Sequence, residues 1–86
     1  MSHLEVAFKE RLDQHYSWPA KYLFKFIVPR GNEIAFEDIF PNTPLTLKAS
    51  SGGKYVSVTV NVLMKSTSEV IEVYKKAYAI EGIISL

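Results

Sequence analysis

Residues 54–86, KYVSVTVNVLMKSTSEVIEVYKKAYAIEGIISL, decide the fold of this chain. Valines stand at every second position of their first part, with Tyr, Ser, Thr and Asn between them. This alternation is typical of a strand with one buried face. After Ser66 the apolar residues recur with a period of about 3.6, which is typical of a helix. Gly82 then leads into a short apolar end, so the pattern predicts strand, helix, strand.

The helix in this stretch has a recognisable start and two distinct sides. Ser66 followed by Glu69 is a capping box, in which the serine side chain accepts a hydrogen bond from the first turn. We expect Glu72 and Lys76 to form an ion pair on the outer side, because they stand four residues apart. The buried side is predicted to carry Val70, Val73, Tyr74 and Ala77.

The remaining elements lie upstream. Residues 45–50 alternate as a strand and lead through a glycine turn into the valine strand, which predicts a hairpin. Residues 21–28, KYLFKFIV, would place apolar side chains on both faces of a strand, as in a central strand of a sheet. Residues 34–40 form a short irregular helix that prolines end, and Leu4, Phe8 and Leu12 give the apolar stripe of an N-terminal helix.

This order of elements predicts an α+β fold. We expect a ferredoxin-like βαββαβ antiparallel sheet with both helices on one face, preceded by a short N-terminal helix. At 86 residues the chain is expected to be one domain. Residues 1–17 are the N-terminal helix and residues 18–86 the βαββαβ core.

Composition excludes several classes of function. Hydrophobic residues at 48% and charged residues at 22% are those of an ordinary globular protein and argue against disorder. A net charge of +1 supplies no general field that would gather nucleic acid or anionic lipid. The absence of cysteine excludes disulfides, thiolate catalysis and zinc–thiolate sites. With no apolar leader or membrane span in the sequence, we expect a cytoplasmic protein.

The face of the predicted sheet away from the helices mixes apolar and hydroxyl side chains. Such a face rarely stays bare, so we expect the N-terminal helix or a second subunit to cover part of it. The sequence therefore predicts a homodimer or a protein partner that uses this surface. Its members are Leu23, Lys25, Ile27, Thr46, Lys48, Tyr55, Ser57 and Thr59.

Four blocks of the chain resemble a known family. WPAKYLFKFIVP, SSGGKYVSVTV, SEVIEVYKKAY and IEGIISL, in this order and spacing, are similar to the YbeD-like family of small bacterial proteins of unknown function. The resemblance covers nearly the whole chain from Trp18. It implies a fold similar to regulatory ACT-like domains and a regulatory role, since some members are encoded near lipoate-synthesis genes. The stretch between Val28 and Leu45 is shorter here, so we expect a reduced first helix.

The resemblance also suggests a ligand site. In ACT-like domains, effectors bind near the loop after the first strand, often at a subunit interface. The matching residues are Pro29, Arg30, Gly31 and Asn32, of which Arg30 is suited to hold a carboxylate or phosphate. The alternative interpretation is a plain surface turn, because Pro and Gly end most strands.

The hairpin turn offers a second candidate site. Hydroxyls, amides and an ammonium group converge there and suggest an anion nest. The spacing lacks that of a phosphate-binding loop, so a tight turn is the alternative interpretation. The residues are Ser51, Gly52, Gly53 and Lys54.

Nucleic-acid binding is a second hypothesis of function. An RNA-recognition domain has the same order of elements, and Lys54 with Tyr55 resembles part of its stacking motif. Ser57 and Val58 supply no second aromatic ring. The face would bind single-stranded nucleic acid through Lys25, Lys48, Tyr55 and Lys65.

An enzyme is the third hypothesis and needs His15 or Glu37 to act as a base. No nucleophile, base and orienting group stand together in the sequence, so we expect a non-enzymatic module. His3 and His15 lie twelve positions apart with no acidic cluster around them, and we expect no metal and no cofactor. The leading hypothesis is a small regulatory or adaptor module that binds a partner protein or a small metabolite.

Overall fold

The computed structural model describes residues 3–85, and the side chains of residues 4–84. Along the chain lie α1 (His3–His15), β1 (Ala20–Pro29), the 3-10 turn η1 (Asn32–Ile34), α2 (Ala35–Ile39), β2 (Thr46–Ala49), β3 (Tyr55–Met64), α3 (Thr67–Tyr78) and β4 (Ile84–Ser85). The predicted strand, helix, strand of residues 54–86 is confirmed, and Leu86 lies outside the described residues.

The strands form one antiparallel sheet in the order β2-β3-β1-β4, so β1 and β3 are central, as predicted. These two strands pair along their whole length, from Ala20 opposite Met64 to Pro29 opposite Tyr55. β2 pairs with β3 over four residues, and β4 pairs with β1 only at Phe26 and Ile27. The sheet is therefore four strands wide near Phe26 and Ile27 and two strands wide at the Ala20 end of β1.

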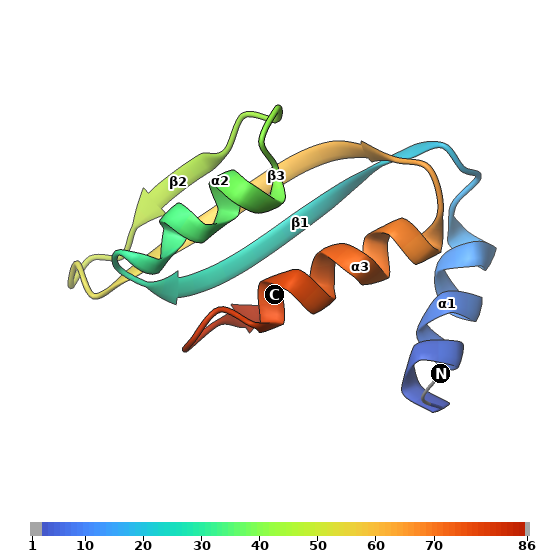
Figure 1. Cartoon of the computed structure of the whole chain (residues 1–86), viewed down its shortest axis with the longest axis horizontal. Helices are drawn as coiled ribbons and strands as arrows, with labels where there is room; N and C mark the ends of the chain where they lie inside the picture. The colour runs from blue at the N-terminus through green and yellow to red at the C-terminus, as the bar shows by residue number, and fades with distance from the viewer. Residues whose placement is uncertain (1–2, 86) are drawn as a thin grey trace.

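The core lies between one face of the sheet and the helices (Figure 1). The alternating valines of β3 point to this side, and Val58 and Val60 are fully buried, as the sequence predicted. The same face carries the aromatic residues of β1. Val70 and Val73 of α3 pack against this face and cover the core on the helix side. The fully or nearly buried residues are Leu12, Phe24, Phe26, Val28, Phe36, Phe40, Val56, Val58, Val60, Met64, Thr67, Val70, Val73 and Ala77.

The predicted ferredoxin-like plan is matched in part. The helix between β1 and β2 is reduced to one 3-10 turn and five α-helical residues, which is the reduction expected from the short stretch after Val28. Because α2 is so short, Leu47 of β2 points to the helix side of the sheet yet remains 50% exposed. Ile34, at the start of the short helix expected over residues 34–40, is 64% exposed.

α1 packs beside α3 rather than on the open side of the sheet, where the sequence allowed it (Figure 1). The ring of Phe8 meets that of Tyr74 edge-on with centroids 5.8 Å apart, and Leu12 is buried. Thr67 donates a hydrogen bond from its hydroxyl to the carboxylate of Asp13. Within residues 3–85 no helix has the length and apolar character that crossing a bilayer requires.

Candidate binding surfaces

The sheet has a second face, opposite the helices, which we call the open face. The register of the strands puts the odd-numbered residues of β1 and β3, with Thr46, Lys48 and Ile84, on this side. It includes every residue that the sequence assigned to it. The members are Lys21, Leu23, Lys25, Ile27, Thr46, Lys48, Tyr55, Ser57, Thr59, Asn61, Leu63 and Ile84.

Large apolar side chains on the open face remain exposed to solvent. Leu23 is 54% exposed, Leu63 is 56% exposed and Ile84 is 51% exposed. Since α1 lies on the helix side, no helix of the described chain covers them. Leu63 and Ile84 were not among the predicted members. They lie near the ends of β3 and β4, and the sequence pattern did not determine where these strands end.

Charges are divided between the two sides of the molecule. All nine acidic residues lie in the helices, in the 3-10 turn or at Glu81, and none lies in a strand. The open face instead carries Lys21, Lys25 and Lys48, and no carboxylate of the described residues lies within ion-pair distance of them. The net charge of +1 thus conceals a basic sheet face and an acidic helix layer.

The two predicted ligand sites lie next to each other at one end of the sheet. Arg30 donates its backbone N–H to the carbonyl oxygen of Lys54 at 2.9 Å. The Arg30 guanidinium reaches across the hairpin tip, since its Nη1 lies 3.6 Å from the position of a Cβ on Gly53. Both basic residues are exposed. The structure therefore brings an arginine and a lysine together where the sequence suggested two separate sites.

Several donors of these predicted sites are already used within the protein. The Gly53 N–H closes the turn on the Ser50 carbonyl oxygen at 2.9 Å, and the Ser50 hydroxyl accepts from the Tyr55 N–H at 3.2 Å. The Gly31 N–H donates to the carboxylate of Glu33. An anion at this end of the sheet would meet chiefly the Arg30 and Lys54 side chains.

A surface hollow of about 500 Å³ adjoins the predicted effector loop. Asn32 is fixed beside it, because its side-chain amide donates to the carbonyl oxygen of Glu81 at 3.0 Å. Pro29 and Arg30 do not line this hollow. Its walls are Gly31, Asn32, Ala35, Ile39, Lys76, Ala79, Ile80 and Glu81.

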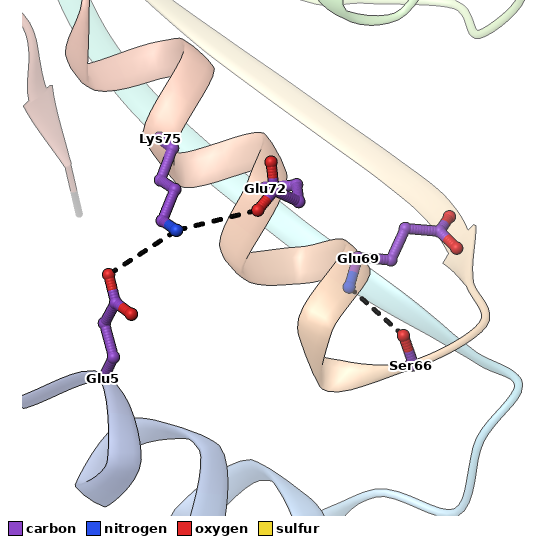
Figure 2. A network of polar contacts seen from close by, with 5 residues as sticks. All are labelled: Glu5, Ser66, Glu69, Glu72 and Lys75. Carbon is purple, nitrogen blue, oxygen red and sulfur yellow. Dashed lines mark hydrogen bonds and ion pairs between the residues drawn. The ribbon is translucent and has the colours of Figure 1, made fainter. Parts of the chain in front are cut away.

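A second hollow, of about 460 Å³, lies between α1 and α3 and was not predicted from the sequence. Lys75 lines it, and its Nζ lies 3.7 Å from a carboxylate oxygen of Glu5 and 3.7 Å from one of Glu72; Figure 2 shows these two contacts. Glu72 thus pairs with Lys75 and not with Lys76 as predicted, because both lysines are within reach and α1 places Glu5 beside the former. The lining is mostly apolar: Leu4, Glu5, Phe8, Ile71, Tyr74, Lys75 and Tyr78.

Tyr74 forms the floor of this hollow and joins it to the sheet. Its ring lies 5.3 Å from that of Phe24 and 5.7 Å from that of Phe26, centroid to centroid. Its hydroxyl is 3.1 Å from that of Tyr22. Burial and, to a smaller extent, the hydrogen bond with Tyr22 raise the pKa of Tyr74 well above its ordinary value.

The residues considered for catalysis and metal binding lie apart. His15 ends α1 and Glu37 is on α2, and both are exposed. The side chain of His3 lies outside the described residues. Over the described part of the chain, no three His, Asp or Glu side chains gather in a way that could hold a metal ion.

The sequence of the chain matches the profile of a family described as a protein of unknown function, DUF493, over residues 13–86. The chain belongs to the DUF493 family. The YbeD-like family is DUF493, so the resemblance stated from the four sequence blocks is confirmed at this level. Comparison with curated proteins and with solved structures found no match.

Proposed function

We propose that this DUF493 protein is a non-enzymatic, cytoplasmic module with a reduced ferredoxin-like, ACT-like fold, and that it acts as a regulator or adaptor by binding a partner protein. The observation that supports this most is the open face. It presents Leu23, Leu63 and Ile84 to solvent between lysines that lack carboxylate partners among the described residues. Leu23 and Leu63 are diagonal neighbours across β1 and β3, and neighbouring exposed apolar groups rimmed by polar ones are typical of interaction sites.

The charge of the open face favours a different protein over a second copy at this surface. A two-fold axis that paired two open faces would bring Lys21, Lys25 and Lys48 of both copies into one interface, to which the described residues of this face contribute no carboxylate. Like charges brought together in this way oppose association. A homodimer would therefore form elsewhere on the chain, for example at an edge of the sheet, and would leave the open face accessible.

A small metabolite is a second candidate ligand, supported by the hollow beside Gly31 and Asn32. Lys76 and Glu81 supply opposite charges at its walls, which suits a small molecule that carries both signs. The nearby Arg30 and Lys54 side chains would attract an anionic group.

Single-stranded nucleic acid is the third candidate and has weaker support. The lysines would contact phosphates, but Tyr55 is the one aromatic residue of the described open face. Non-specific binding of single strands depends on base stacking as well as on charge. A titration with single-stranded RNA at low salt tests this, and any binding must weaken steeply as salt is added.

The experiment for the leading proposal is affinity capture with matched variants, followed by reconstitution with the purified partner. Leu23→Ser with Leu63→Ser removes the apolar groups of the open face, while Leu47→Ser removes an equally exposed leucine on the opposite side. We expect the first variant to lose the partner and the second to retain it. A partner that both variants retain would contradict the proposal, and light scattering of each protein reports its oligomeric state.

Thermal unfolding of the protein and of two single variants, Lys76→Gln and Leu23→Ser, allows a direct screen for metabolites. A reproducible rise of the thermal midpoint with a metabolite, lipoate and amino acids included, would identify a ligand of the protein. If the shift disappears in Lys76→Gln but persists in Leu23→Ser, the ligand occupies the hollow beside Asn32.

A further inference from the structure

β1 has an outer edge that is mostly unpaired. It is ten residues long and pairs with β3 along its entire length. On the other side β4 pairs only with Phe26 and Ile27. From Ala20 to Lys25, the described part of the chain supplies no strand on this side.

An unpaired strand edge presents a row of free backbone N–H and C=O groups and is a template for another strand. β4 runs antiparallel to β1, from Ile27 toward Phe26. A strand that continued this row would pass Lys25 first and Ala20 last. It would end beside the segment that connects α1 to β1.

The helix side of this vacant row adjoins the hollow between α1 and α3. Tyr74 lines the hollow and also meets the rings of Phe24 and Tyr22 edge-on, and the side chains of these two residues point to the helix side of β1. Phe8 and Tyr78 enclose the hollow from α1 and α3. Side chains of a strand in the vacant row that point to the helix side would be directed toward these aromatic walls.

The other side of the vacant row borders the open face. Lys21, Leu23 and Lys25 alternate there along β1. An added strand would face two lysines and one leucine on this side. Acidic and apolar side chains suit these positions best, because opposite charges across a strand pair are favourable.

We propose that an extended segment of a partner protein adds to the edge of β1 at residues 20–25 as an antiparallel strand. Its bulky apolar side chains enter the hollow between α1 and α3, and its acidic side chains lie beside Lys21 and Lys25. This inference rests on the proposed function, since it specifies how the partner protein binds. A second copy fits poorly, because none of the strands of this chain contains an acidic residue.

The test uses NMR spectroscopy of the full chain with a synthetic peptide as the probe. The peptide is short, blocked at both ends, and alternates Glu with Phe and Leu. Two control peptides carry Lys in place of Glu, or N-methyl groups on the backbone amides that would pair with β1. We expect only the first peptide to slow exchange of those amides of residues 20–25 that face the free edge rather than β3, and to shift the signals of Tyr74 and Tyr78.

Protein variants show which lysines are used. Lys21→Glu with Lys25→Glu is expected to weaken binding roughly tenfold, because two favourable cross-strand pairs become repulsive. Lys48→Glu is the matched control, since Lys48 lies on the same face but on β2, at the other edge of the sheet. Its affinity is expected to stay within about twofold of the original.

Three results would overturn the proposal. One is equal binding of the N-methylated peptide, which would exclude strand addition. Another is shifts confined to Tyr55, Ser57 and Thr59, which would show docking on the open face without an added strand and would leave the proposed function intact. The third is the absence of any shift with this peptide. The proposed function is tested separately, by whether the variant with Leu23→Ser and Leu63→Ser loses the captured partner.

Discussion

Tyr74 connects α3 with α1 and with β1 through aromatic ring contacts. Its ring contacts Phe8 of α1, Phe24 and Phe26 of β1, and Tyr78 within α3. The sequence placed Tyr74 in a buried helix stripe with Val70, Val73 and Ala77; those three are buried, whereas Tyr74 is half-buried and packs against the core. That it also forms the floor of a hollow was not predictable, because the hollow depends on where α1 docks.

The raised pKa of Tyr74 makes stability depend on pH in the alkaline range. In the unfolded chain this hydroxyl ionises near its ordinary value of 10.0, whereas in the folded protein it keeps its proton to higher pH. The folded state therefore binds more protons than the unfolded state above that value, and stability falls as pH rises through it. Urea unfolding between about pH 8 and about pH 11 measures this.

We expect Tyr74→Phe to show a smaller alkaline loss of stability than the unaltered protein. Tyr55→Phe is the control, because it removes an exposed tyrosine from the open face. At neutral pH, Tyr74→Phe costs about 1 kcal/mol through the lost hydrogen bond with Tyr22. Identical pH profiles for all three proteins would contradict the buried, protonated hydroxyl.

Gly82 is a residue whose backbone position excludes a side chain. Its φ is 76°, and a Cβ placed on it would lie 2.6 Å from Cγ of Pro29. We expect Gly82→Ala to destabilise the protein by about 1–3 kcal/mol, since both the conformation and the contact oppose it. Gly52→Ala is the control, because a Cβ there meets no atom within 4 Å. Equal unfolding midpoints for the two variants would show that the turn after α3 can shift.

At the scale of elements, the strands and α3 were predictable because each buries one regular face. The valines of β3 and the stripe of α3 repeat at periods that local geometry imposes. The position of α1 was not predictable, since Leu4, Phe8 and Leu12 indicate an apolar stripe without indicating what it contacts. Leu4 in fact remains 79% exposed.

The start of α3 depends on one side chain. The Ser66 Oγ accepts a hydrogen bond from the Glu69 N–H at 3.2 Å (Figure 2). We expect Ser66→Ala to lower the free energy of unfolding by about 1 kcal/mol, because a helix N–H loses its partner. Ser68→Ala is the control on an exposed residue of the first turn. If both variants unfold at the same urea concentration, the cap does not stabilise α3.

Apolar packing, more than ion pairing, is expected to hold α1 against α3. Leu12 is 8% exposed, so Leu12→Ala should cost about 2–3 kcal/mol. Lys75→Gln removes the contacts with Glu5 and Glu72 but should cost less than about 1 kcal/mol, because the lysine side chain is 54% exposed. Urea unfolding of both variants decides the order, and a larger loss for Lys75→Gln would reverse this interpretation.

For the whole molecule, the sequence predicted eight members of the open face, without Leu63 and Ile84, and did not predict how charge is divided between the two sides. Alternation alone puts Lys25 and Lys48 on the same side of the sheet once the hairpin is placed. The separation of charge becomes visible only when the register and the positions of all acidic residues are known. Similarly, Arg30 and Lys54 are twenty-four positions apart in sequence, and only the pairing of β1 with β3 brings them together.

The division of charge can be measured with two variants of equal net charge. Lys25→Gln with Lys48→Gln removes two cations from the open face, while Arg11→Gln with Lys76→Gln removes two from the helices. At neutral pH and low ionic strength, a cation exchanger binds the protein through its most positive surface, because screening limits contact to nearby charges. We expect the first variant to elute at clearly lower salt than the second, since on the helices acidic neighbours already offset the removed cations. Coincident elution would mean that the net charge alone governs binding, and that the open face offers an acidic partner no local attraction.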